Sequence, residues 1–269
     1  MAATDKVFGG SIPEIYDRFM VPLIFEPYAA DLARRVAGIQ PRDVLETAAG
    51  TGVLTRALAS RLAPSTRIVA TDLNQPMLDQ ASRRQVSGSP QWKQADALAL
   101  PFADEGFDVV ACQFGVMFFP DKVQGYKEAR RMLRPGGRFL FNVWDRIEEN
   151  DFAFVVTQAL ARVFPDDPPR FMARTPHGHH DVGRIRQDLG AAGFTDISVA
   201  SVDAKSKAAS PRHAAVAFCQ GTPLRSEIEA RDASRLEEAT NLATDALAER
   251  FGKDAIEGRI RALVVTAAR

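Results

Sequence analysis

The first part of the chain alternates between short apolar runs and amphipathic stretches. The apolar runs predict β-strands at Val44-Leu45 and over residues 67–71, 91–95, 107–112 and 138–144. Between them, helical periodicity is expected through Leu62, after Asn74, which suits a helix cap, and over residues 122–133. Strands and helices alternating at this spacing predict βαβ units in a parallel, doubly wound α/β sheet.

The flanking regions are less regular. Helices are expected over residues 11–19 and 28–36, and Ser11 and Glu14 have the spacing of a capping box. Beyond Trp144 we expect an irregular second half, made of helices over 152–164 and 182–192, a loop over 165–181, a strand over 197–202, helices over 213–220 and 224–251, and a last strand over 261–267. The helices at about 211–252 are interpreted as an insertion.

Composition narrows the class of protein. The 269 residues are 46% hydrophobic, and 34 Lys and Arg balance 34 Asp and Glu, so net charge gives no drive toward nucleic acid. Two cysteines, Cys112 and Cys219, form neither a metal motif nor a disulfide framework. No apolar run approaches the roughly 18 residues of a membrane span, and Met1 to Gly10 lack a secretory profile. These features predict a soluble, cytoplasmic globular protein.

Candidate chemistry begins after the first strand, where Glu46 precedes a turn that contains Gly50 and Gly52. Glycine permits a positive φ and lets a ligand approach the main chain. The following helix offers unpaired N–H groups to a carboxylate or phosphate. An ordinary strand-to-helix turn also holds two glycines, so this feature alone does not establish a ligand site.

Asp72 ends the second predicted strand. In a doubly wound sheet its carboxylate lies beside the first turn, where it can accept hydrogen bonds from two ribose hydroxyls. The alternative is a helix-capping aspartate, and Asn74 already suits that role. The combination favours a nucleoside cofactor.

Two nucleoside cofactors fit this arrangement, a dinucleotide such as NAD and S-adenosylmethionine (SAM). The dinucleotide fingerprint requires a third glycine where this chain has Thr55. A pyrophosphate about 4 Å from Glu46 would cost roughly 1–4 kcal/mol. SAM carries an ammonium and a sulfonium, which a carboxylate attracts. The charges therefore favour SAM.

Five motifs in order resemble those of the class I SAM-dependent methyltransferases, in particular the branch of ubiquinone/menaquinone-biosynthesis enzymes. They lie between Asp43 and Trp144 and comprise Glu46-x-Ala48-x-Gly50-Thr51-Gly52, Asp72, Ala95-Asp96-Ala97 with Leu100-Pro101-Phe102, Phe107-Asp108-Val109-Val110, and Leu133-Arg134-Pro135-Gly136-Gly137. Ala192-Gly193-Phe194 is a weaker match. The resemblance implies a Rossmann-like sheet of seven strands, mostly parallel, with the last strand antiparallel. It divides one domain into a helical lid (1–40), a SAM-binding core (41–145) and a substrate-side half (146–269).

The resemblance also implies roles for individual residues. Glu46 faces the methionine ammonium, Asp72 holds the ribose, and Asp96 accepts from the adenine amino group. The remaining cofactor contacts are Ala48, Gly50, Thr51 and Gly52 under the methionine and ribose, Leu73 and Met77 against the adenine, the Ala97 main chain, and Gln113 near the methionine. The family usually has glycine where this chain has Ala48. A methyl group fits that position if φ is negative.

Acceptor contacts are less defined. Tyr16 and Phe19 are candidates for the lid over SAM, but their spacing equally describes core packing. Phe114 and Met117 either line an apolar substrate pocket or pack beneath the sheet. His177, His179 and His180 suggest a metal site, but a solvated loop is the preferred interpretation and no metal is expected. His180 is the candidate general base. Arg225 either anchors an acidic substrate or forms a surface ion pair.

The predicted activity is methyl transfer from SAM to a small, hydrophobic or aromatic acceptor by in-line displacement, which releases S-adenosylhomocysteine. Methylation of a protein or RNA is the first alternative. Neutral net charge and Gln113-Phe114-Gly115-Val116, in place of an Asn-Pro-Pro-Tyr type motif, count against it. A non-catalytic SAM-binding protein is the second alternative, and a nicotinamide oxidoreductase is disfavoured by Thr55 and Glu46. The oligomeric state is not predicted.

Overall fold

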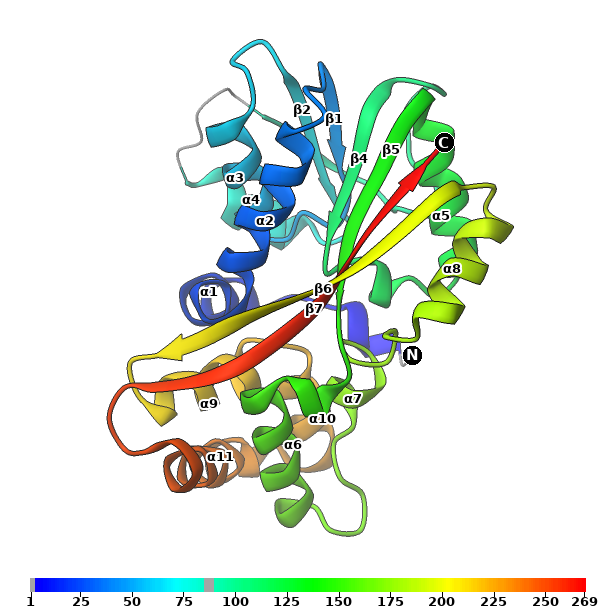
Figure 1. The fold of residues 1–269 in the computed structure, drawn as a ribbon. Helices are drawn as coiled ribbons and strands as arrows, with labels where there is room; N and C mark the ends of the chain where they lie inside the picture. The colour runs from blue at the N-terminus through cyan, green and yellow to red at the C-terminus, as the bar shows by residue number, and fades with distance from the viewer. Residues whose placement is uncertain (1–2, 85–89) are drawn as a thin grey trace. The chain divides into compact units, whose positions relative to one another are not determined.

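A computed structural model describes residues 3–84 and 90–269 (Figure 1). Its sheet contains β1 (Asp43–Glu46), β2 (Arg67–Asp72), β3 (Gln91–Gln94), β4 (Phe107–Gln113), β5 (Leu133–Trp144), β6 (Thr195–Ala208) and β7 (Ile256–Ala268). In this part of the chain the strand order is β3-β2-β1-β4-β5-β7-β6. β1 to β5 pair in parallel, and β7 is antiparallel. The predicted doubly wound, seven-stranded fold is confirmed.

The strand order reverses at β1, which pairs in parallel with both β2 and β4. Leu45 lies opposite Val69 on one side and Val110 on the other. In open α/β sheets, ligands bind beyond the carboxyl ends of the strands at this switch point. The topology therefore predicts a ligand site in the loops that follow β1, β2 and β4.

The chain forms two compact units. The core unit comprises Pro27–Val143, His179–Val202 and Ala262–Arg269, and the helical unit comprises Met1–Glu26, Trp144–Gly178 and Asp203–Arg261. The predicted division into a lid, a core and a substrate half stays a prediction, and residues 1 and 2 of that lid lie outside the described residues.

Helices cover both faces of the sheet in the core unit. Figure 1 shows α2 (Glu26–Ala37), α3 (Val53–Arg61) and α4 (Gln75–Ser82) on one face, and α5 (Lys122–Met132) and α8 (Val182–Ala191) on the other. The α2 residues Ala29, Leu32, Ala33 and Val36 recur at helical spacing and are buried together against Leu54, Leu58, Val109 and Leu140. Burial of this apolar stripe stabilises the sheet that holds the loops.

The helical unit contains α1 (Ile12–Ile15), a π-helical segment (Tyr16–Phe25), α6 (Asp151–Val163), α7 (Phe171–Arg174), α9 (Pro211–Gln220), α10 (Leu224–Asp232) and α11 (Leu236–Phe251). α11 packs against α6 and α9. It buries Ala239, Ala243 and Leu247, which are spaced four residues apart on one helix face. The helices of the predicted insertion are α9, α10 and α11.

Several local predictions were wrong. Ser11 precedes α1 but makes no capping hydrogen bond, because its hydroxyl is the acceptor for Arg225. The helix expected over 224–251 breaks at Asp232, whose side chain accepts from the N–H of Ser234. α7 interrupts the loop expected over 165–181. β6 and β7 are longer than predicted, since the two strands continue in the helical unit with alternating burial.

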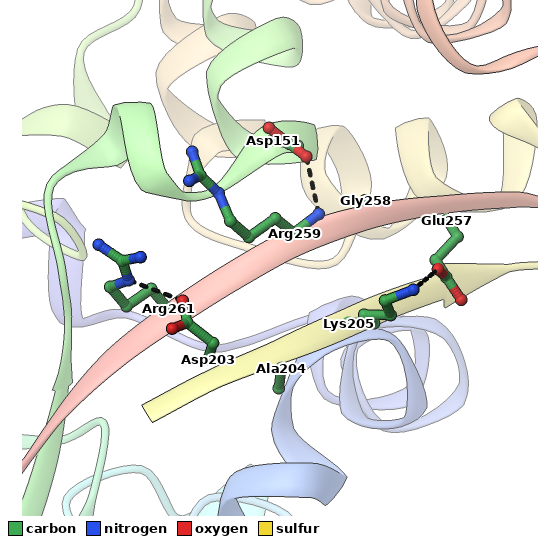
Figure 2. Close-up of a pocket in the computed structure, with 8 residues that line it drawn as sticks. All are labelled: Asp151, Asp203, Ala204, Lys205, Glu257, Gly258, Arg259 and Arg261. Atoms are coloured by element: carbon green, nitrogen blue, oxygen red, sulfur yellow. Dashed lines mark hydrogen bonds and ion pairs between the residues drawn. The ribbon is translucent and has the colours of Figure 1, made fainter. Parts of the chain in front are cut away.

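The helical unit has a shallow, charged cavity of about 540 Å³ along the ends of β6 and β7 (Figure 2). Lys205 pairs with Glu257, and Arg261 Nε donates to Asp203 Oδ1 at 2.7 Å. The Arg259 N–H donates to Asp151 Oδ2 at 2.7 Å. Exposed pairs contribute only about 0–1 kcal/mol each. The balanced charges indicate contacts that join β6, β7 and the start of α6, and not a site for an anion.

Cys112 and Cys219 are buried free thiols. Burial raises the pKa of each to about 12, so neither is a reactive thiolate near neutral pH.

Among residues 3–84 and 90–269, no helix combines the length and the apolar composition that crossing a bilayer requires.

Candidate active site

The loop after β1 carries a buried carboxylate. Glu46 is 1% exposed, and Thr55 Oγ donates to its Oε2 at 2.6 Å. Burial raises the pKa of Glu46 to about 8, although the Thr55 hydrogen bond and the charge of Arg56 lower it. A buried carboxyl of this kind ionises readily only when a cation lies beside it. Its environment fits a site for a positively charged ligand group.

Three residues of this loop have left-handed backbone conformations, Ala48 (φ 54°), Gly50 (φ 56°) and Gly52 (φ 80°). The condition stated for a methyl group at Ala48, a negative φ, is therefore not met. Space for this methyl comes from Gly115, where an added Cβ would lie 2.4 Å from the Ala48 Cβ. The absence of a side chain at one position thus accommodates the methyl at the other.

Gly52 is required for packing as well as for its φ. An added Cβ there would lie 2.7 Å from Trp92 Cη2, so the Trp92 side chain of β3 leaves no room for a side chain at this position. Its neighbour Thr51 is buried, and Thr51 Oγ has no hydrogen-bond partner among the described residues. An unpaired buried hydroxyl costs about 1–3 kcal/mol, which a ligand contact would offset.

Asp72 ties the loops after β1 and β2 together. Its Oδ2 accepts from the Gly50 N–H at 2.8 Å, and its Oδ1 accepts from the Asn74 N–H at 2.8 Å. Burial raises the pKa of Asp72. A carboxylate has about four acceptor directions, and because Oδ1 also accepts from Asn74 Nδ2 at 3.4 Å, the capacity left for a diol lies mainly on Oδ2. Asn74 occupies the cap position of α4 but makes no side-chain cap; its amide instead contacts Asp72 at 3.4 Å.

The remaining predicted cofactor residues lie around these two carboxylates. Met77 is buried with its Cε beside Gly50, and Leu73 is 40% exposed. Asp96 is exposed after β3, and its Oδ1 accepts from the Leu98 N–H at 2.9 Å. The Ala95 N–H donates to Asp72 O at 3.0 Å, which fixes the Asp96-Ala97 loop beside the end of β2.

The turn after β4 is strained. Phe114 has a φ of 51°, which is unfavourable for a bulky residue, and it is buried with its ring edge-on to Tyr28 at 5.4 Å. Its N–H donates to the Asn142 side-chain Oδ1 at 3.0 Å and to the Asn142 main-chain O at 3.2 Å. Strain of this kind concentrates at functional sites. The preceding residue, Gln113, is buried opposite Asn142 in the sheet.

Met117 lies in a 3-10 turn (Val116–Phe118) after this strained residue and is buried. Lys122 Nζ donates to Phe119 O at 3.1 Å and holds the end of the turn. The structure therefore places Gln113 at the end of β4 and Phe114 and Met117 in the turn that follows it. Asn142 was missed by the sequence analysis; the available signal was a single amide within the apolar run Phe139-Leu140-Phe141.

The solvated-loop interpretation was wrong for two of the three histidines. In the core unit His179 is buried and lies 3.1 Å from the Tyr126 hydroxyl, and burial lowers its pKa to about 4. In the helical unit His177 is buried, with Nδ1 2.8 Å from Asp145 O. His180 is half-buried, and its role as a base stays a prediction. Within the described ranges no cluster of three His, Cys, Asp or Glu could hold a metal ion.

The predicted lid residues belong to the helical unit. Tyr16 packs against Phe8 and Phe25, with ring centroids 6.0 and 5.2 Å away, and Phe19 meets His213 edge-on at 4.9 Å. These contacts support the core-packing alternative, and the lid role stays a prediction.

Arg225 forms the ion pair that was the alternative to substrate binding, with Glu229 at 2.7 Å.

Comparison with known proteins identifies the family. The profile of a methyltransferase domain matches residues 45–141. The chain is 41% identical over 173 residues to the demethylmenaquinone methyltransferase of Lactobacillus johnsonii. This alignment covers 59% of this chain and 70% of that protein. The chain belongs to the class I SAM-dependent methyltransferases. It is also 29% identical over 208 residues to the ubiquinone/menaquinone biosynthesis C-methyltransferase of Ectopseudomonas mendocina, covering 72% of this chain and 76% of the relative.

Solved structures agree on the fold of this methyltransferase. The YcgJ protein of Bacillus subtilis has a TM-score of 0.56 at 18% identity and covers 90% of this chain and 98% of its own. The [4+2]-cyclase SpnF has the same TM-score and identity, covering 90% and 80%. The phosphoethanolamine N-methyltransferase 2 of Haemonchus contortus, solved with S-adenosylhomocysteine, has a TM-score of 0.52 at 16% identity and covers 97% and 61%.

Proposed function

We propose that this methyltransferase transfers the methyl group of SAM to a ring carbon of a small, apolar quinol. The observation that carries the proposal is the similarity to two enzymes named for quinone biosynthesis, which extends over more than half of this chain in each case. Buried Phe114, Met117 and Tyr28 at and beside the end of β4 support an aromatic acceptor.

The core unit fits the cofactor. Glu46 would face the methionine ammonium, because its buried carboxyl gains a counter-charge there. Asp72 would hold the two ribose hydroxyls through the acceptor capacity left on Oδ2 and through Oδ1, where a hydroxyl would replace the 3.4 Å contact of Asn74 Nδ2. Asp96 would accept from the adenine amino group through the oxygen that does not cap Leu98. The other predicted contacts are Ala48, Thr51, Gly52, Leu73, Met77, Ala97 and Gln113.

SAM supplies an activated methyl group, which the acceptor nucleophile takes in line as the carbon–sulfur bond breaks and S-adenosylhomocysteine leaves. For a quinolate, electron density from the ring oxygen makes the adjacent ring carbon the nucleophile, and that carbon then loses its proton to water. The protein's part is to orient the acceptor and exclude bulk water. A catalytic triad is not needed, and His180 remains the candidate base for the quinol hydroxyl.

The proposal is tested by acceptor screening. Purified protein and SAM are incubated anaerobically with substituted 1,4-benzoquinols and 1,4-naphthoquinols, with polar amines, and with purified protein and RNA. We expect S-adenosylhomocysteine release and a carbon-methylated product only with the quinols. Asp72→Ala should lower turnover at SAM concentrations near the wild-type Kd, whereas Asp245→Ala, which changes an exposed aspartate of α11, is the matched control that should not.

Transfer to protein or RNA alone would instead support the macromolecular alternative. SAM binding without transfer to any acceptor would support a non-catalytic role or a different reaction on the same fold. Methylation of a quinol oxygen would retain the acceptor class but contradict carbon transfer. The cytoplasmic location also remains part of the proposal.

A further inference from the structure

Asn142 is a buried amide at the carboxyl end of β5. It is 0% exposed and lies opposite Gln113, the last residue of β4. The methyltransferase profile ends at Phe141, so the family match assigns Asn142 no role. A fully buried amide within an apolar strand requires hydrogen bonds for both of its ends.

Among the described residues, only one end of this amide has a hydrogen-bond partner. Asn142 Oδ1 accepts from the Phe114 N–H at 3.0 Å, whereas Asn142 Nδ2 has no hydrogen-bond partner among the described residues. Exchanging the amide oxygen and nitrogen would place two donors against each other at Phe114, so the orientation is set by chemistry. A buried donor without an acceptor costs about 1–3 kcal/mol.

The place of Asn142 in the sheet separates it from the predicted ribose and adenine contacts. Glu46 ends β1, Asp72 ends β2 and Asp96 follows β3, while Asn142 lies on the far side of β4. With neighbouring strands about 4.8 Å apart, β5 is roughly 10 Å from β1 and roughly 14 Å from β2. The ribose and adenine contacts therefore lie away from this donor, and the turn of Phe114 lies next to it.

We propose that Asn142 Nδ2 donates a hydrogen bond to a ring oxygen of the methyl acceptor. This assignment rests on the proposed function. A donor at that oxygen favours the ionised quinol and fixes which ring carbon faces the methyl group. The bond that Asn142 Oδ1 makes to the strained Phe114 holds the amide so that Nδ2 keeps its direction.

Two variants test the assignment. Asn142→Leu has nearly the same shape and removes the donor, while the Phe114 N–H retains the main-chain oxygen of residue 142. Asn142→Asp keeps an acceptor for Phe114 but loses the amide donor. Calorimetry measures the Kd of S-adenosylhomocysteine, and steady-state kinetics with the best quinol from the screen measure kcat and KM from pH 6 to 9. Thermal melts confirm folding.

We expect both variants to bind S-adenosylhomocysteine within about twofold of wild type. With the quinol, kcat/KM should fall about 10- to 100-fold, as for loss of one hydrogen bond to a charged oxygen. The loss in Asn142→Asp should grow with pH, because an ionised carboxylate repels the quinolate. Asn150→Leu is the matched control, since that buried amide bonds to Arg146 and Arg261; its melting temperature should fall while KM stays unchanged.

Unchanged kcat/KM in both Asn142 variants would overturn the assignment while leaving the proposed function intact. An equal loss of S-adenosylhomocysteine affinity would also overturn it, because Asn142 would then serve the cofactor or the loop. If wild type turns over no quinol, the proposed function fails first, and the assignment to a quinol oxygen fails with it.

Discussion

Thr55 Oγ donates a 2.6 Å hydrogen bond to Glu46 Oε2, and both residues are buried. Thr55 stands where a dinucleotide-binding protein needs its third glycine, so the same residue disfavours a dinucleotide and supports the carboxyl that suits SAM. A glycine at this position would leave a buried acceptor without its donor. The preference for SAM over NAD thus has a structural basis as well as a sequence one.

Glu46 should limit the stability of the cofactor-free protein. Its pKa is about 8 in the folded protein, against an ordinary value of 4.5, so the folded state retains a proton that the unfolded chain loses. The contribution of Glu46 to stability is therefore full below about pH 4.5 and declines as pH rises to about 8. Glu46→Gln should melt near the wild-type temperature at pH 5 and at least about 2 °C above it at pH 8. Calorimetric melts with Asp245→Asn as control measure this; equal differences at both pH values would contradict it.

Binding of SAM should release a proton from Glu46. A cationic ligand favours the ionised carboxylate, so affinity should rise with pH up to about 8. Titration calorimetry at pH 7 in two buffers of different ionisation enthalpy measures the proton count. The cofactor amino group titrates near the same pH, and Glu46→Gln is therefore the control: it should bind more weakly and with less buffer dependence. Identical buffer dependence in both proteins would show that Glu46 stays protonated.

Asp72 should determine affinity for SAM and S-adenosylhomocysteine but give no NAD binding. Asp72→Ala removes the acceptor for the diol and for the Gly50 N–H, and we expect at least about tenfold weaker binding, or about 1.4 kcal/mol. Asp72→Asn retains one acceptor oxygen and should lose less. Calorimetric titration of all three ligands checks this, with melts to separate unfolding from weak binding. Unaltered affinity in folded Asp72→Ala would remove Asp72 from the cofactor site.

Ala48 and Gly115 should be energetically coupled. An alanine at Gly115 would crowd the Ala48 Cβ at 2.4 Å and Cys112 Sγ at 2.6 Å, so Gly115→Ala should cost about 1–3 kcal/mol. Ala48→Gly removes a methyl from a left-handed position and should be close to neutral. The double variant should recover part of the loss. Urea unfolding of the four proteins gives the coupling energy, and additive losses would contradict the pairing.

The sequence predicted the first five strands and their acidic residues because each motif is local. Glu46 and Asp72 end buried strands, and their neighbours along the chain supply the turn chemistry. The φ of Ala48 was not predictable, since the space for its methyl comes from Gly115 in another loop. The sequence likewise does not show that the Phe114 N–H donates to both the side-chain and the main-chain oxygen of Asn142.

The second half of the chain was predicted less well for the same reason. The break at Asp232 depends on a local side-chain bond to Ser234, which the sequence Asp-Ala-Ser permits but does not require. Burial of His177 and His179 depends on Asp145 and Tyr126, which lie far away in sequence. A Pro- and His-rich segment therefore resembled a solvated loop, although parts of it pack.

Acid should destabilise the core unit through His179. Burial lowers its pKa to about 4 from 6.5, and the charge of Lys122 acts in the same direction. Between these two pH values the unfolded chain therefore binds a proton at His179 that the folded protein does not. The resulting stability is present above about pH 6.5 and is lost as pH falls toward 4. His179→Gln, which cannot be protonated, should lose less stability between pH 7 and pH 5 than wild type.

Tyr126→Phe removes the hydroxyl 3.1 Å from the ring and should cost about 1–3 kcal/mol at pH 7. Urea unfolding at both pH values measures these changes, and a wild-type curve no steeper with pH than that of His179→Gln would show that other groups cause the acid sensitivity.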